Sequence, residues 1–304
     1  MPTILPPPSP VISVLSQKGG TGKTTMVRTL ADVLRRTGLD VLAVDLDPQG
    51  NLSDYFDVDP DAYPTMGEVL SGGARAAEAI HKQMIPANLG LAEAELVLSG
   101  KMGRELTLKR ALHEPRRQFE LILIDCPPAL GLLTVNALVA STHALVSAEG
   151  EYFSLQGVEQ VLEVMQLARE NLNESLDWLG VVMNIADLRT NHSRDALKSL
   201  HESFDDRVFE TVIRRSIRYP ESAERGVSIL DYSPELGKDF LALADELLAR
   251  LGDDETRERL GTLREELALP SSSPAPAATA TIEPEPAEET TPPAPAAPAA
   301  PTGW

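Results

Sequence analysis

The chain has little that could support disulfide or zinc chemistry. Cys126 is the only cysteine among its 304 residues, and its five histidines show no spacing typical of metal ligands. No stretch approaches the roughly 20 apolar residues that a membrane helix needs, and the first residues lack the basic segment of a signal peptide. We therefore expect a protein of the reducing cytoplasm, with no membrane partner and no metal site built from Cys and His.

Basic residues are also scarce. Lys and Arg number 27 against 46 Asp and Glu, which gives a formal net charge of -19. This balance argues against a general affinity for nucleic acid, although binding depends on a local basic surface and not on the total charge. Residues 270–304 contain no Lys or Arg and are rich in Pro and Ala, a composition that favours a disordered tail.

The most informative segment lies between an apolar run at Val11–Leu15 and a helical pattern at 24–36. A glycine-rich turn in this position directs backbone N–H groups and a helix N-terminus at a phosphate chain. Lys23 would reach the β- and γ-phosphates, and the Thr24 hydroxyl would coordinate Mg²⁺. The alternative is a solvated lysine in a glycine-rich turn, which the flanking strand and helix disfavour. We expect nucleotide contacts from Gly19, Gly20, Thr21, Gly22, Lys23, Thr24 and Thr25.

Two further apolar runs end in acids. The run at Val41–Val44 precedes Asp45 and Asp47, and the run at Leu121–Ile124 precedes Asp125. In an open parallel sheet, ligands bind at the edge formed by the carboxyl ends of the strands. These carboxylates can therefore share one crevice with the glycine-rich turn. A single acid after a strand would be weak support, because Asp is also a common cap and turn former.

The order of these patterns predicts an α/β fold with a doubly wound, mostly parallel sheet, because strand-like runs alternate with helix-length segments. Residues 57–101 are less regular, and we interpret them as a peripheral helical region near the nucleotide entrance. The other expected elements are strands at 144–147 and 179–183 and helices at 131–140, 154–171, 193–204 and 234–251. Leucines at helical spacing predict one more short amphipathic helix, within 253–269, packed on the domain.

The motifs resemble those of the ParA family of deviant P-loop ATPases, which includes the MinD-like proteins. The shared features are Gln-Lys-Gly-Gly-x-Gly-Lys-Thr-Thr, with Gln17 in place of the first P-loop glycine, then Val-Asp-x-Asp-Pro-Gln-Gly-Asn and Asp-x-Pro-Pro. The likeness covers about residues 11–251. It implies a P-loop NTPase of the deviant Walker-A type. We divide the chain into a Pro-rich extension (1–10), an ATPase domain (11–252), a charged amphipathic helix (253–269) and a tail (270–304).

The resemblance implies roles for individual residues. ParA proteins form an ATP sandwich homodimer, in which the extra lysine, Lys18, would cross to the partner's nucleotide and neutralise charge on its phosphates. Asp47 would position the attacking water. Asp45 and Asp125 would hold Mg²⁺ through its water shell, with Thr24 as a direct ligand. These roles agree with the needs of phosphoryl transfer, which are positioning and charge neutralisation.

The resemblance also implies a surface that binds double-stranded DNA. Arg189, Arg215 and Arg218 match segments that grip phosphates without reading sequence, and such contacts are salt-dependent. The alternative interpretation of these arginines is a solvated charged face with pairs inside the chain, to Glu221, Glu224 or Asp187.

The chain departs from the family pattern at two places. Asn184 could hydrogen-bond the amino group of the base, as a matching Asn does in related members, or it could cap the end of its strand. Pro220 is expected to restrict Tyr219 to extended conformations, which would re-aim Arg218.

The function implied by the resemblance is a slow, partner-stimulated ATPase that requires ATP and Mg²⁺. It would bind DNA in its ATP state, associate with the nucleoid and drive chromosome or plasmid partition with a ParB-like centromere-binding protein. One alternative keeps the ATPase but changes the cargo to a protein assembly, such as a chemoreceptor array, a microcompartment or a septum factor. Another is a nucleotide-gated scaffold with negligible turnover.

Overall fold

The computed structural model describes residues 9–150 and 154–267. The tail predicted at 270–304 and most of the predicted N-terminal extension lie outside the described residues. The proposed division of the chain into domains therefore stays a prediction.

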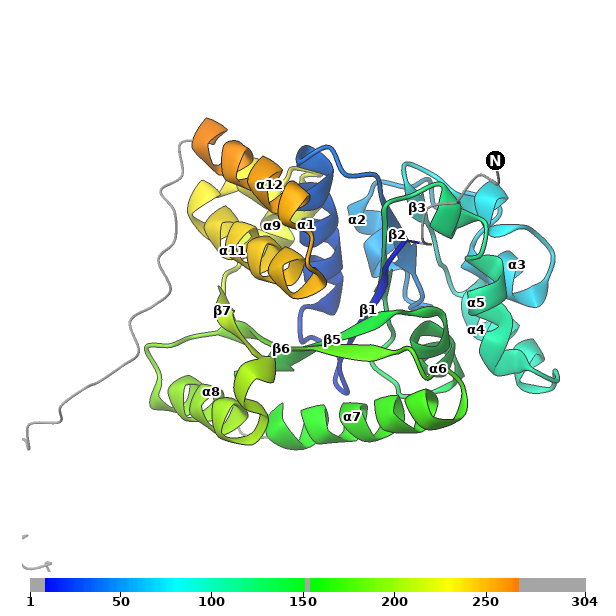
Figure 1. The fold of residues 1–304 in the computed structure, drawn as a ribbon. Coiled ribbons are helices and arrows are strands. Elements are labelled where there is room, and N and C mark those ends of the chain that lie inside the picture. Colours follow the sequence, from blue (N-terminus) through cyan, green and yellow to red (C-terminus); the bar gives the residue numbers. More distant parts are fainter. Residues whose placement is uncertain (1–8, 151–153, 268–304) are drawn as a thin grey trace, which may run out of the picture. The chain divides into compact units, whose positions relative to one another are not determined.

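A parallel sheet forms the centre of the described part (Figure 1). Over the described residues it has seven strands in the order β3-β2-β4-β1-β5-β6-β7, and every neighbouring pair is parallel. The α/β prediction is confirmed. The strands are β1 (Val11–Leu15), β2 (Val41–Asp45), β3 (Met84–Ile85), β4 (Leu121–Asp125), β5 (His143–Glu149), β6 (Asp177–Ala186) and β7 (Val208–Arg214).

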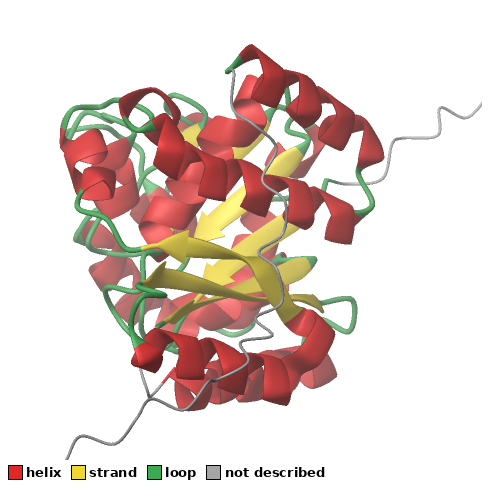
Figure 2. Cartoon of the chain, turned by 90° about the vertical axis from the view of Figure 1, so that its left-hand side faces the viewer, coloured by secondary structure: helices red, strands yellow, loops and turns green. Residues whose placement is uncertain are grey.

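Helices cover both faces of the sheet (Figures 1 and 2). One face carries α1 (Lys23–Arg36), α2 (Asn51–Tyr55), α9 (Arg218–Glu224), α10 (Ile229–Tyr232), α11 (Pro234–Leu251) and α12 (Asp254–Glu266). The other face carries α3 (Met66–Ser71), α4 (Gly90–Ser99), α5 (Thr107–Ala111), α6 (Leu132–Ala140), α7 (Ser154–Asn171) and α8 (Asn191–Phe204).

The central strands are short and apolar because both of their faces are buried. Every residue of β1, β2 and β4 is buried. Since successive side chains of a strand point to opposite faces, Val11 and Leu15 join the core on the α6–α7 side, whereas Ile12 and Val14 join the core under α1 and α11. A strand covered on both sides has a continuous apolar sequence, which is the signal that made these three strands predictable.

Two edge strands escaped the sequence analysis. Residues 57–101 contain helices as expected, but they also supply β3, which pairs with β2 in parallel. At the other edge β7 pairs only with β6 among the described strands and includes the exposed Glu210. An edge strand need not be apolar on both faces, so neither segment has the continuous run that marks the central strands.

The expectation for Tyr219 was wrong. Tyr219 and Pro220 lie in the first turn of α9, and Tyr219 is buried against Phe240 of α11 with ring centroids 5.7 Å apart. Proline is tolerated in a first turn because the N–H it lacks would have no helical acceptor there. The packing of the aromatic ring outweighs the preference of a pre-proline residue for extended backbone.

Helix α12 packs on the domain through Leu260 and Leu263, which are buried beside α11. Asp253 caps its N-terminus by accepting a hydrogen bond from the Thr256 N–H at 3.0 Å. Among the described helices, none is both long enough and apolar enough to cross a membrane.

Candidate functional site

The loops that follow β1, β2 and β4 meet at the carboxyl edge of the sheet, because β4 lies between the other two strands. Asp45 and Asp125 end neighbouring strands and stand opposite each other in the β2–β4 register. The Leu46 N–H donates to the Asp125 carbonyl at 3.0 Å, which ties the two loops together. The structure thus brings the glycine-rich turn and the three acids to one edge.

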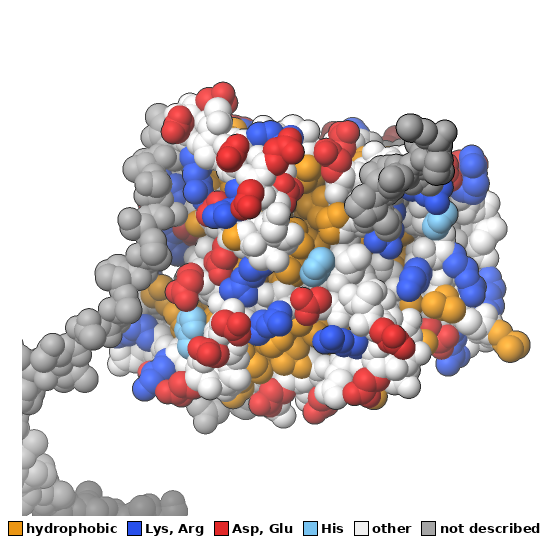
Figure 3. Space-filling model, in the orientation of Figure 1, with side chains coloured by type: hydrophobic (Ala, Val, Ile, Leu, Met, Phe, Trp, Pro, Cys, Tyr) orange, Lys and Arg blue, Asp and Glu red, His pale blue; other side chains and the backbone are white. Residues whose placement is uncertain are grey.

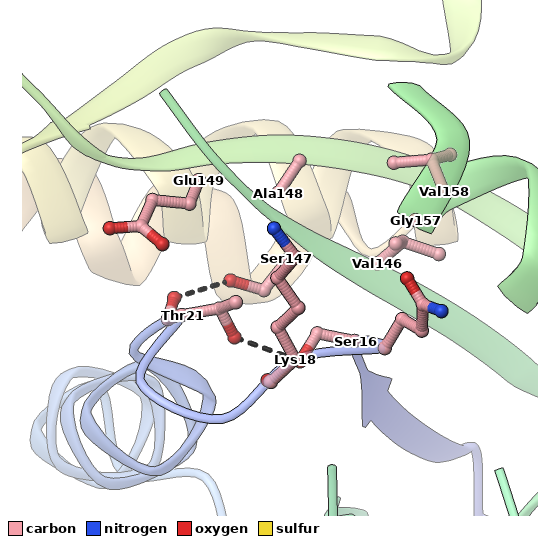
Figure 4. A pocket seen from close by; sticks show the side chains of 10 residues that line it. Ser16, Lys18, Thr21, Val146, Ser147, Ala148, Glu149, Gly157 and Val158 are labelled. Carbon is pink, nitrogen blue, oxygen red and sulfur yellow. Dashed lines mark hydrogen bonds between the residues drawn. The ribbon is translucent and has the colours of Figure 1, made fainter. Parts of the chain in front are cut away.

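Side chains hold the glycine-rich turn from within (Figure 4). The Ser16 hydroxyl donates to the Lys18 carbonyl and accepts from the Thr21 hydroxyl and the Lys23 ammonium, with all three distances at 2.8 Å. From β5, the Ser147 hydroxyl donates to the Thr21 carbonyl at 2.9 Å. The turn is therefore shaped before any ligand binds, and Lys23 is buried inside it.

Glycine is required at the last turn position before α1. Gly22 has φ +77°, a left-handed conformation that side chains rarely adopt. A Cβ atom built there would lie 2.6 Å from Nδ2 of Asn184. The close approach of turn and strand thus depends on the absence of a side chain at this position.

Asn184 fastens the turn to β6. Its buried amide donates to the carbonyls of Thr21 and Gly22 at 3.0 and 3.3 Å, and its Oδ1 accepts from the Ile185 N–H at 2.8 Å. These contacts support the interpretation of Asn184 as a strand-end polar cap that also positions the turn. Contact between Asn184 and a base stays a prediction.

Asp125 is a buried acid of the site, and neither of its carboxylate oxygens meets the geometry of a hydrogen bond within the described residues. Burial, reinforced by the neighbouring Asp45, raises the pKa of Asp125, and the Thr24 hydroxyl and the Lys23 ammonium offset only part of this rise. Burial likewise lowers the pKa of Lys23, against the opposing effect of Asp125. A cation or a donor placed here would find two unsatisfied oxygens.

Asp45 stabilises the loop that carries Asp47 by accepting hydrogen bonds from it. One oxygen of Asp45 accepts from the Asp47 N–H at 3.1 Å, and the other accepts from the N–H and hydroxyl of Ser53 at 3.0 and 2.8 Å. Burial raises the pKa of Asp45, although these hydrogen bonds favour its charged form. Ser53 also accepts from the Ala87 N–H at 3.0 Å, so it links this loop to the segment after β3.

Comparisons with known proteins agree with this geometry. A family model described as an AAA domain matches residues 9–178. The sporulation initiation inhibitor protein Soj of Bacillus subtilis is 36% identical over 248 residues, which are 79% of this chain and 98% of Soj. The chromosome partitioning protein ParA of Caulobacter vibrioides is 33% identical over 261 residues, which are 82% of this chain and 98% of that protein. This chain belongs to the ParA/Soj/MinD family of P-loop ATPases.

Solved structures of similar proteins extend the comparison. Cobyrinic acid a,c-diamide synthase from Mycobacterium smegmatis, solved with bound ADP and magnesium, has a TM-score of 0.65 and 37% identity over 71% of this chain and 93% of that chain. McdA from Cyanothece has a TM-score of 0.73 and 25% identity over 79% of this chain and 99% of that chain. The fold of this chain is therefore shared by a cobyrinic acid a,c-diamide synthase and by McdA.

The three arginines predicted to contact DNA each have a partner within this ParA-family chain. Arg189 pairs with Asp187 at 2.8 Å, as the alternative interpretation expected, and is 89% exposed. Arg215 pairs with Glu149 at 3.3 Å, and Arg218 donates to the Ser233 hydroxyl at 3.1 Å. Arg215 and Arg218 follow β7, so they lie beyond the carboxyl end of the same sheet as the glycine-rich turn.

Sequence reasoning missed the residues that hold the site together. Ser16, Ser53 and Ser147 each make the contacts described above, yet a serine within or just after a strand, or early in a helix, is too common to be singled out. Glu149 was also missed, although it lines a cavity together with Lys18 (Figure 4). Its position at the end of β5, a strand with the same apolar pattern as β4, was the available signal.

Gly22→Ala is predicted to weaken Mg-ADP binding about tenfold or more, because the left-handed backbone and the displaced Asn184 amide each carry a cost of order 1–3 kcal/mol. Gly261→Ala in α12 is the control, since Gly261 lies outside the candidate site, has no such φ, and a Cβ there meets nothing within 4 Å. Isothermal titration calorimetry on both variants measures the difference. Equal affinities for the two variants would contradict the role assigned to Gly22.

Asp125→Asn is predicted to change how stability depends on pH in EDTA. Burial raises the pKa of folded Asp125 to about 8, whereas an unfolded aspartate ionises near pH 4. The native state therefore binds more protons in this window, and its stability falls as the pH rises through it. The variant lacks this fall, so its advantage in Tm over the wild type should grow with pH and reach about 3 °C or more at about pH 8.

Asp54→Asn, at an exposed acid of α2, is the control for this experiment and should follow the wild type at every pH. A Tm difference between Asp125→Asn and wild type that stays constant from about pH 5 to about pH 9 would mean that Asp125 is already ionised at the lower pH.

Proposed function

We propose that this protein is a Mg²⁺- and ATP-dependent dimerisation switch that hydrolyses ATP slowly and binds DNA without sequence preference in its ATP state. A ParB-like centromere-binding partner would stimulate hydrolysis and release the DNA. This cycle, in the cytoplasm, would move chromosome or plasmid copies over the nucleoid. The observation that carries the proposal is the meeting of Lys23, Thr24 and the unsatisfied Asp125 carboxylate at the carboxyl edge of a parallel sheet.

The donor set fits magnesium. Mg²⁺ prefers oxygen ligands, keeps several waters and is commonly held by one or two carboxylates together with substrate phosphates. Thr24 would bind the ion directly, and Asp125 and Asp45 would act through its water shell. When bound, the ion would neutralise phosphate charge. It would also favour the ionised form of Asp125, whose pKa burial otherwise raises.

The residues around this site have distinct proposed tasks. The turn from Gly19 to Thr25 would cradle the phosphates, with Lys23 as the buried cation. Asp47 would orient the attacking water, and its loop is already fixed, because its backbone donates to Asp45 and its carboxylate accepts from the Gln49 N–H at 3.0 Å. Lys18 would complete the partner's site in the dimer, as an arginine finger supplied in trans does in other NTPases.

A local cluster would provide the DNA contact despite the acidic total. Arg215 and Arg218, with Arg189 on the neighbouring loop, would bind backbone phosphates, and such binding releases counterions and weakens with salt. Phosphates would have to displace the present partners of these side chains. Two of those partners, Asp187 and Glu149, are carboxylates.

The pairing of the arginines and the net charge of -19 favour a second candidate function. In it, the same ATP-driven switch positions a protein cargo. A scaffold with negligible turnover has less support, because Lys18, Lys23, Asp47 and Asp125 are all present at one sheet edge.

Asp47→Ala is predicted to lower ATP turnover about 100-fold or more, since a water-orienting group contributes on this order, while ATP binding persists and the dimer accumulates. Steady-state phosphate release and analytical ultracentrifugation with Mg-ATP measure the two effects. Asp54→Ala, at an exposed position on the next helix, is the control. Turnover that survives in Asp47→Ala would remove Asp47 from the proposed mechanism.

Arg215→Ala/Arg218→Ala is predicted to abolish binding to random-sequence duplex DNA with Mg²⁺ and a non-hydrolysable ATP analogue. The wild type should bind weakly with ADP and more tightly with the analogue, and its affinity should fall as the salt concentration rises. Lys109→Ala/Arg110→Ala removes the same charge from the exposed side of α5 and should bind like the wild type. Wild-type protein that binds no DNA with any nucleotide would favour the protein-cargo function instead.

A further inference from the structure

The end of β5 lies between the Lys18 cavity and the arginine segment after β7. Glu149, the last residue of β5, lines the cavity together with Ser16, Lys18 and Thr21 (Figure 4). Its Oε1 also lies 3.3 Å from Nη2 of Arg215. Glu149 therefore lines a cavity beside the glycine-rich turn and also contacts an arginine of the candidate DNA surface.

The pair is held from both sides. The Glu149 side chain is only 21% exposed, whereas the Arg215 side chain is 58% exposed. The backbone of Arg215 is fixed to the end of β6, because its N–H donates to the Ala186 carbonyl at 2.9 Å. The backbone of Arg215 is thus fixed to β6, and its guanidinium pairs with an acid that is more buried than itself.

A second contact links the same point to α8. The Gly150 carbonyl accepts a hydrogen bond from the Ser193 hydroxyl at 3.2 Å. A Cβ built at Gly150 would lie 2.9 Å from the Ser193 hydroxyl oxygen. Ser193 lies in the first turn of α8, which follows the loop of Arg189. A displacement of residues 149–150 therefore reaches both arginine-bearing segments through direct contacts.

We infer that Glu149 is a positioning residue that restrains Arg215 and so couples the cavity beside Lys18 to DNA affinity. This inference rests on the proposed function. A guanidinium binds a carboxylate and a phosphate through the same N–H donors, so Arg215 engages DNA only when the bond to Glu149 opens. A movement at the end of β5 that opens this bond makes Arg215 available. The energy of a partly exposed ion pair, about 0.2–1 kcal/mol, corresponds to a change in affinity of up to about fivefold per protomer.

The test compares Glu149→Gln with wild type in binding to random-sequence duplex DNA across a salt series, with ADP and with a non-hydrolysable ATP analogue. Removal of the carboxylate should raise affinity with ADP about two- to fivefold and steepen the salt slope by up to about 0.9 per freed arginine. Affinity with the analogue should stay unchanged. The nucleotide dependence of binding therefore falls, which a purely structural role for Glu149 would not produce.

Glu224→Gln is the matched control. It removes one negative charge from the exposed side of α9, the helix that begins at Arg218, and Glu224 forms no ion pair within the described residues. A rise in ADP-state affinity equal to that of Glu149→Gln would mean that net charge alone is responsible and would overturn the inference. In an Arg215→Ala background, Glu149→Gln should have no effect on the ADP-state affinity.

The outcomes separate the inference from the proposed function. If wild-type binding depends on Arg215 and Glu149→Gln leaves the ADP-state affinity unchanged, the inference is wrong and the proposed function stands. If wild type binds no DNA in either nucleotide state, both are wrong. Glu149→Asp, which keeps the charge but shortens the reach to Arg215, should act in the same direction as Glu149→Gln and is the substitute if that variant does not fold.

Discussion

The burial of the Asp125 carboxylate beside the Lys23 ammonium is the constraint on which the rest of the site depends. A charge taken out of water is costly unless it is paired or neutralised, and Asp125 has no hydrogen-bond partner of good geometry among the described residues. The central place of β4 in a sheet covered on both faces keeps water away from this group. The same burial that disfavours the ionised acid in the isolated chain prepares it for a cation, because a low-dielectric site strengthens every charge interaction.

The surrounding polar contacts fix backbone geometry and leave the reactive groups in place. Ser16, Ser147 and Asn184 bind carbonyls or side chains of the glycine-rich turn, while Asp45 and Ser53 hold the loop of Asp47. None of these contacts needs a nucleotide. This arrangement suits phosphoryl transfer, in which positioning and preorganised charge matter more than covalent chemistry. The family membership and this geometry lead to the same class of protein by separate routes.

The acidity of the chain does not settle its partners, because the relevant charges are local. Arginines follow β6 and β7, at the same edge as the glycine-rich turn, and acids of the same edge pair with two of them. Such pairs weaken the attraction of these arginines to phosphate without removing it, since an exposed ion pair contributes little free energy. A surface of this kind can respond to a small movement of one strand end, which an unpaired cluster of arginines could not do.

The sequence by itself determined the parallel α/β class and the three central strands with the loops that follow them, and it predicted roles for Lys23, Thr24 and Asp125. Continuous apolar runs and a glycine-rich turn are local patterns, and local patterns can be recognised in a single sequence. Only the tertiary structure decided that Asn184 binds the turn, that Asp45 organises the loop of Asp47, that β3 and β7 form the edges of the sheet, and that Glu149 contacts Arg215. Except for those of Asp45, these contacts join residues far apart in the chain. They depend on which strands are neighbours, a choice made by the packing of the whole sheet and not by any one segment.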